Sequence, residues 1–79
     1  MSRQKSMRAL DSLEIDEAAR VVEIAGEGAL AVRLAELGFV PGTLVRLVKR
    51  APFGDPLQLE LRGYHLSLRR AESARVRVA

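Results

Sequence analysis

The chain has 79 residues, enough for one small domain, with a formal charge of +3 and no cysteine. Without cysteine there can be no disulfide, no thiolate metal site and no cysteine nucleophile, which favours a reducing compartment. No stretch approaches the roughly 20 apolar residues of a membrane-spanning helix, and no secretory signal peptide is recognisable. We therefore expect a cytoplasmic protein that reaches the inner face of a membrane only if a partner recruits it.

Charge is unevenly distributed along the chain. Residues 1–8 carry three Lys or Arg residues and no acid, and we predict that they form a disordered tail before a single domain at 9–79. Residues 9–39 carry seven acids against two bases, whereas residues 40–79 carry eight bases against three acids. The two halves could face different partners, or they could neutralise each other across the fold.

The first elements after the tail carry weak signals. Leu10 and Leu13 are the first expected core residues. The charged stretch 14–20 is predicted to be an exposed connection. The β-branched cluster between Val21 and Ile24 is typical of a first strand.

A short amphipathic helix is predicted over residues 29–37. Leu30, Leu34 and Leu37 stand at i, i+4 and i+7, which places them on one helical face. Gly38 follows the last of them, and a glycine just past a helix end takes the left-handed backbone conformation without a steric clash. A helix of this length does not persist alone and must be held by packing.

A tight turn and a strand follow the helix. In this capping motif the second residue past the helix packs back onto its last turn, so Phe39 is expected to contact Leu34. Pro41 and Gly42 fit the two central positions of a type II turn, since proline sets φ at the first and glycine supplies a positive φ at the second. Residues 43–50 are then predicted to form a strand.

The second half of the sequence is typical of strands separated by turns. Two prolines and a glycine in residues 51–56 exclude a regular element and indicate an exposed loop. In residues 57–62 leucines alternate with Gln, Glu and Arg, the pattern of a half-buried strand. Gly63 marks a tight turn, and further strands are predicted at 64–68 and 75–78.

These elements define the expected fold. We predict a mainly β protein, a small SH3-like barrel of about five antiparallel strands with one short α-helix at about 29–37. The reason is that a small antiparallel sheet protects its edges by curling into a partly closed barrel. The helix should plug one end of the barrel or bridge the first two strands.

The sequence carries no constellation typical of catalysis or metal binding. The single histidine, His65, is expected to face solvent, and the serines lack the context of a catalytic nucleophile. The three acids within residues 14–17 lack the spacing of a calcium loop. Gly26 and Gly28 are not followed by the residues of a phosphate loop. We expect neither enzymatic activity, nor a cofactor, nor a metal site.

Two kinds of binding surface stay open. A basic barrel exterior with aromatic platforms could bind nucleic acid, although the same charges also suit a solvated strand exterior. The residues that would form it are Arg46, Lys49, Arg50, Arg62, Arg69, Arg70, Arg75 and Arg77, with Phe53 and Tyr64 as aromatics. Alternatively, exposed apolar side chains at the helix and its corner could contact a protein, with core packing as the competing explanation for them.

Several motifs, taken in order, resemble one known family. They are the leucine-bearing helix that ends in Leu37-Gly38, the Pro41-Gly42 turn followed by Val45, the loop 52–56, the Gly63-Tyr64 turn and the strand 66–69. From about Leu10 onward the chain resembles the FeoA family, the small cytoplasmic accessory proteins of bacterial ferrous-iron uptake. Family members typically have a glycine in the turn before the first strand, where this chain has Asp16-Glu17-Ala18.

The resemblance implies an SH3-like barrel and a role beside FeoB, a large membrane protein with a cytoplasmic GTP-binding domain that moves ferrous iron. Protein–protein contact with that transporter is the first hypothesis, and a small basic barrel that binds nucleic acid is the alternative. A self-associating scaffold, a homo-oligomer, is a third. The expected contact residues are Val32, Arg33, Glu36, Phe39 and Val40 at the helix corner, and Phe53 with Asp55 in the proline-rich loop.

Overall fold

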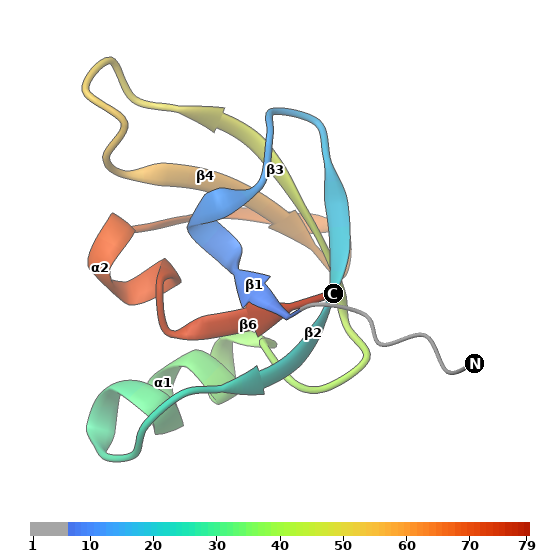
Figure 1. Ribbon diagram of the computed structural model, residues 1–79, viewed down its shortest axis with the longest axis vertical. Helices are drawn as coiled ribbons and strands as arrows, with labels where there is room; N and C mark the ends of the chain where they lie inside the picture. The colour runs from blue at the N-terminus through green and yellow to red at the C-terminus, as the bar shows by residue number, and fades with distance from the viewer. Residues whose placement is uncertain (1–6) are drawn as a thin grey trace.

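The computed structural model describes residues 7–79, which form a strongly curved antiparallel sheet and three short helical segments (Figure 1). The elements are β1 (Arg8–Ala9), the 3₁₀ turn η1 (Leu10–Ser12), β2 (Ala18–Ile24), α1 (Ala29–Leu37), β3 (Leu44–Arg50), β4 (Leu57–Leu61), β5 (Tyr64–Leu68), α2 (Arg70–Ser73) and β6 (Val76–Val78). The strand order is β1-β6-β2-β3-β4-β5. The mainly β prediction is confirmed, with six strands in this part of the chain rather than about five. Within residues 7–79, no helix is long and apolar enough to cross a membrane.

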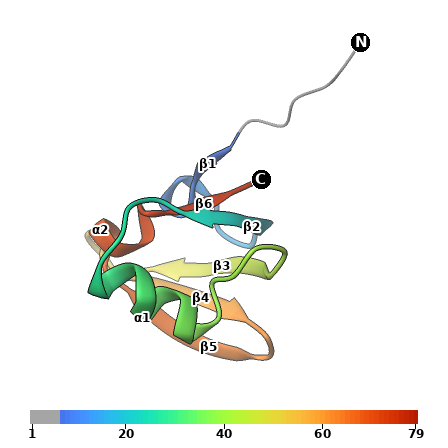
Figure 2. The same cartoon turned by 90° about the horizontal axis from the view of Figure 1, so that it is seen from below.

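The strand β2 belongs to both halves of the barrel. Its first residues, Ala18–Arg20, pair with β3, whereas the stretch from Val21 to Ile24 pairs with β6. The register shifts between Val21 and Glu23, and such a bulge bends a strand and increases its twist. The sheet therefore folds over on itself, and Figure 2 shows β6 and β2 lying above β4 and β5.

The core follows the alternation that the sequence predicts. Along β4, Leu57, Leu59 and Leu61 are buried, whereas Gln58 and Glu60 between them are only half-buried. The other fully buried apolar side chains are Leu10, Leu13, Leu34, Phe39, Val45, Leu47, Leu68, Val76 and Val78. Every strand from β3 to β6 contributes to this core, so it lies inside the curved sheet.

The end of α1 has the predicted glycine cap. Gly38 has a φ of 116°, and its N–H donates to the carbonyl of Ala35 at 3.0 Å. The N–H of Phe39 donates to the carbonyl of Leu34 at 3.1 Å, which completes the capping motif. This backbone path turns the Phe39 side chain into the core beside Leu34, where it is 1% exposed. The prediction that Phe39 contacts a partner at the surface was therefore wrong.

The turn after the helix also matches the prediction. The N–H of Thr43 donates to the carbonyl of Val40 at 3.1 Å, and Gly42 supplies a φ of 93°. The hydroxyl of Tyr64, at the start of β5, donates to the carbonyl of Leu37. The end of α1 is thereby tied to the sheet, and α1 lies at one end of the barrel (Figure 1).

The N-terminal part differs most from the prediction. β2 begins three residues earlier than expected, because Ala18–Arg20 pair with Leu44–Arg46. The predicted exposed connection is shorter accordingly, and it turns at Asp16, whose φ is 72°. Arg8, which the prediction assigned to the tail, belongs to β1 and pairs with Val78 of β6. Met7 is exposed, and the rest of that predicted tail, residues 1–6, lies outside the described residues.

Candidate partner-binding surface

The helix corner keeps four of its five predicted contact residues at least partly accessible. Val32 is 58% exposed, and Arg33 and Glu36 are also exposed on α1. Val40 is half-buried. The guanidinium of Arg33 lies 3.1 Å from the carboxylate of Glu72 on α2, so part of its charge is used within the domain.

The loop between β3 and β4 holds the other two predicted contact residues. Phe53 is 97% exposed at the tip of a turn that is closed by a 2.7 Å hydrogen bond from the N–H of Gly54 to the carbonyl of Ala51. Asp55 is exposed and also has a role within the domain, since its Oδ1 accepts a hydrogen bond from the backbone N–H of Arg70 at 3.0 Å. Asp55 therefore holds the loop against α2.

The structure does not bring these two groups together. Figure 1 shows α1 at the bottom of the molecule and the β3–β4 loop at its top. The predicted contact residues therefore form two separate surfaces, the helix corner and the loop tip, instead of one.

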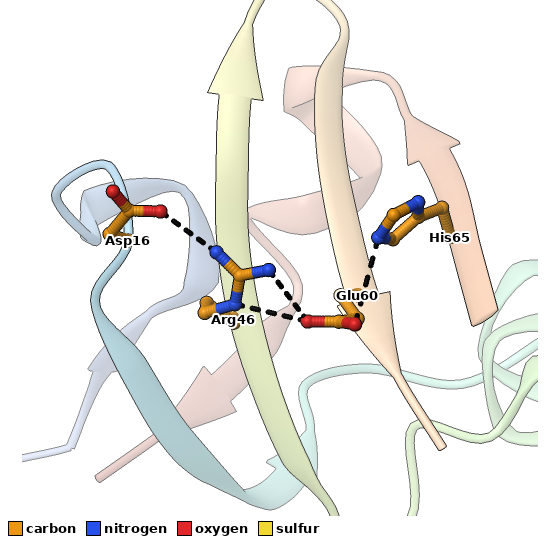
Figure 3. A network of polar contacts seen from close by, with 4 residues as sticks. All are labelled: Asp16, Arg46, Glu60 and His65. Atoms are coloured by element: carbon orange, nitrogen blue, oxygen red, sulfur yellow. Dashed lines mark hydrogen bonds and ion pairs between the residues drawn. The ribbon is translucent and has the colours of Figure 1, made fainter. Parts of the chain in front are cut away.

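A row of charged side chains crosses the outer face of the sheet, and sequence reasoning missed it (Figure 3). Nε and Nη2 of Arg46 donate to Oε1 of Glu60 at 3.0 and 2.7 Å, and Nη1 donates to Asp16 at 2.8 Å. Nε2 of His65 lies 3.7 Å from the other oxygen of Glu60. The row forms because Arg46, Glu60 and His65 are register partners on β3, β4 and β5.

This row shifts the titration of its central pair. The hydrogen bonds from Arg46 lower the pKa of Glu60, and the nearby positive charge of Arg46 adds to that effect. Reciprocally, hydrogen bonding to Glu60 raises the pKa of Arg46. Glu60 thus stays ionised in the folded chain to a lower pH than in the unfolded chain.

The lowered pKa predicts a loss of stability in acid. A carboxylate whose pKa is lower in the folded state stabilises the fold above its unfolded pKa of about 4.3, and that contribution is lost as the pH falls through the folded value. We expect the urea midpoint to fall less between about pH 5 and pH 3 in Glu60→Gln than in the wild type. Glu36→Gln is the control, because Glu36 makes no ion pair within residues 7–79. Equal pH profiles for both variants would contradict the assignment.

Two shallow depressions lie next to this row and share Leu44 and Arg62. One, of about 500 Å³, is bounded by the turn at 40–43, and the other, of about 250 Å³, reaches Arg46 and Glu60. Leu44 is 50% exposed here and was not predicted as a surface residue. The sequence does contain a signal for this exposure. Side chains alternate along β3, and because Val45 faces the core, Leu44 before it faces outward.

The basic side chains proposed for nucleic acid are partly engaged within the fold. Arg46 is paired in the charged row, and Arg50 and Arg75 each donate two hydrogen bonds to backbone carbonyl groups. Across residues 7–79, no group of three or more His, Cys, Asp or Glu side chains is placed to hold a metal ion. His65 is exposed, as predicted.

Comparison with known proteins assigns the family. A family model described as the FeoA domain matches residues 8–79. The chain belongs to the FeoA family. It is 35% identical over 69 residues to a Porphyromonas gingivalis protein named "Fe(2+) transport protein A/Fe(2+) transporter FeoB fusion protein". That alignment covers 87% of this chain and 8% of the fusion protein, so the chain spans a small part of this relative.

Solved FeoA structures share the fold. The solution structure of a FeoA-like protein from Clostridium acetobutylicum has a TM-score of 0.89 at 34% identity, covering 96% of this chain and 88% of that one. The crystal structure of Stenotrophomonas maltophilia FeoA complexed with zinc, described as a prokaryotic SH3 domain protein, has a TM-score of 0.81 at 36% identity. The alignment covers 90% of this chain and 88% of the S. maltophilia chain. The predicted SH3-like fold of this FeoA chain is therefore confirmed.

Proposed function

We propose that this chain is a non-enzymatic accessory protein of bacterial ferrous-iron uptake that binds the cytoplasmic part of a FeoB-type membrane transporter. The observation that carries the proposal is the P. gingivalis relative, whose name joins transport protein A and transporter FeoB in one polypeptide. Two parts of one chain meet at a high effective concentration, which suits parts that work in contact. In this proposal, the FeoA chain makes the same contact on the cytoplasmic side, and the contact places it at the inner face of the membrane.

The surface of the domain supports a protein contact. Val32, Leu44 and Phe53 are large apolar side chains that are 58%, 50% and 97% exposed, and they mark alternative candidate surfaces for that contact. Exposed apolar side chains gain free energy when a partner covers them, and on a small domain they commonly mark a binding site.

A pull-down tests this function. The purified chain is offered the cytoplasmic GTP-binding part of the FeoB-type transporter from the same organism, and an unrelated cytoplasmic GTPase is the control. We expect the transporter part to be retained and the control to pass through. Absence of retention at tens of micromolar protein, or equal retention of both, would contradict the proposal.

A further inference from the structure

The tip of the β3–β4 loop presents an aromatic side chain that the domain itself does not use. Phe53 is 97% exposed, whereas the only other phenylalanine, Phe39, is 1% exposed. A phenylalanine is among the side chains that gain most from burial. Nothing in the packing of residues 7–79 requires an aromatic group at position 53, so its use is to be sought outside the domain.

Hydrogen bonds fix the backbone of the loop that carries this side chain. A hydrogen bond of 2.7 Å from the N–H of Gly54 to the carbonyl of Ala51 closes a turn whose central residues are Pro52 and Phe53. A second bond, of 3.1 Å, joins the N–H of Ala51 to the carbonyl of Pro56 across the neck of the loop. A preformed tip loses little conformational entropy when it binds, which favours its use as an anchor.

The base of the loop is fixed to the rest of the domain as well. Oδ1 of Asp55 accepts the backbone N–H of Arg70 at 3.0 Å. Nη2 of Arg50 donates to the carbonyls of Asp11 and Leu13 at 2.7 and 2.9 Å. The loop, η1 and α2 therefore form one platform from which Phe53 projects.

Two positive charges flank this platform. Nη1 of Arg69 lies 3.9 Å from Asp55, and Nε of Arg70 lies 3.6 Å from Asp11, yet both arginine side chains are more than half exposed. An exposed aromatic side chain with charged groups beside it matches the usual anatomy of a protein interface, which has an apolar centre and a polar rim. The complementary surface on a partner is an apolar pocket with carboxylates at its edge.

We propose that Phe53 is the anchor of this chain and inserts into an acid-rimmed apolar pocket on the cytoplasmic part of the transporter. This inference rests on the proposed function and assigns the contact to the loop tip, not to the helix corner. A lipid surface is a weaker fit, since membrane anchoring by one short apolar group is marginal.

The test compares Phe53→Ala with Val32→Ala, which truncates an exposed apolar residue at the opposite end of the molecule. Binding of each variant of the 79-residue chain to the transporter, reconstituted in lipid nanodiscs, is measured by calorimetry at two salt concentrations. We expect Phe53→Ala to weaken binding at least tenfold and Val32→Ala to change it less than twofold. Arg69→Glu should weaken binding too, with a larger loss at low salt. Thermal unfolding of Phe53→Ala should match the wild type, because the side chain is exposed.

The outcomes separate this inference from the function beneath it. Wild-type binding that Phe53→Ala leaves intact would overturn the anchor and leave the transporter contact standing. Absence of wild-type binding would overturn both. Equal Phe53-dependent binding to empty nanodiscs of phosphatidylethanolamine and phosphatidylglycerol would replace the protein pocket with a lipid surface, and so overturn the inference.

Discussion

Replacing Phe39 with alanine is expected to lower the free energy of unfolding by about 3–5 kcal/mol, the usual cost of truncating a buried aromatic residue. Phe39 is 1% exposed and lies in the same buried cluster as Leu34 and the leucines of β4. A small domain has a total stability of only about 5–15 kcal/mol, so the loss is a large fraction of it. Urea unfolding followed by circular dichroism at 25 °C measures the difference.

Phe53→Ala is the matched control, because it makes the same chemical change on an exposed side chain. We expect it to change the free energy of unfolding by no more than about 0.5 kcal/mol. A wild-type midpoint for Phe39→Ala, or equal destabilisation by the two variants, would show that the burial of Phe39 is misassigned. Since Phe39→Ala damages the fold, a loss of binding in that variant would say nothing about docking.

The parts of the fold that sequence reasoning predicted well are those set by local chemistry. The leucine spacing and Gly38 fix α1 and its cap, and Pro41-Gly42 fixes the next turn. The alternation in β4 identifies its buried face. Each of these signals acts over fewer than about ten residues, so the sequence alone contains it.

The parts that it predicted poorly depend on partners distant in sequence. Residues Ala18–Arg20 form part of a strand because they pair with β3. Arg8 is in a strand because it pairs with Val78 of β6. The position of Phe39 beside Leu34 was predicted from the local cap, but its nearly complete burial depends on core residues distant in sequence, such as the leucines of β4. For the candidate site, the exposure of Phe53 was predictable from its Pro-Gly loop. The bracing role of Asp55 was not, since it needs α2 in place.

Replacing Gly38 with asparagine is expected to lower the free energy of unfolding by about 2–4 kcal/mol, through backbone strain and crowding together. Gly38 has a φ of 116°, which a residue with a side chain adopts only at a cost. A Cβ atom there would lie 3.1 Å from Cδ1 of Leu61 and 3.3 Å from the hydroxyl oxygen of Tyr64. Because that hydroxyl donates to the carbonyl of Leu37, displacing it would also release the end of α1.

Gly42→Asn separates the two causes. Gly42 also has a positive φ, 93°, but a Cβ atom there would meet nothing within 4 Å, and asparagine is tolerated at this position of a type II turn. We expect this control to cost about 1 kcal/mol or less in the same urea measurement. The additional loss of unfolding free energy in Gly38→Asn then measures the contact of the α1 cap with β4 and β5. That contact positions the helix on the barrel. Equal losses at the two glycines would mean that backbone strain alone matters and that the cap is not packed against those strands.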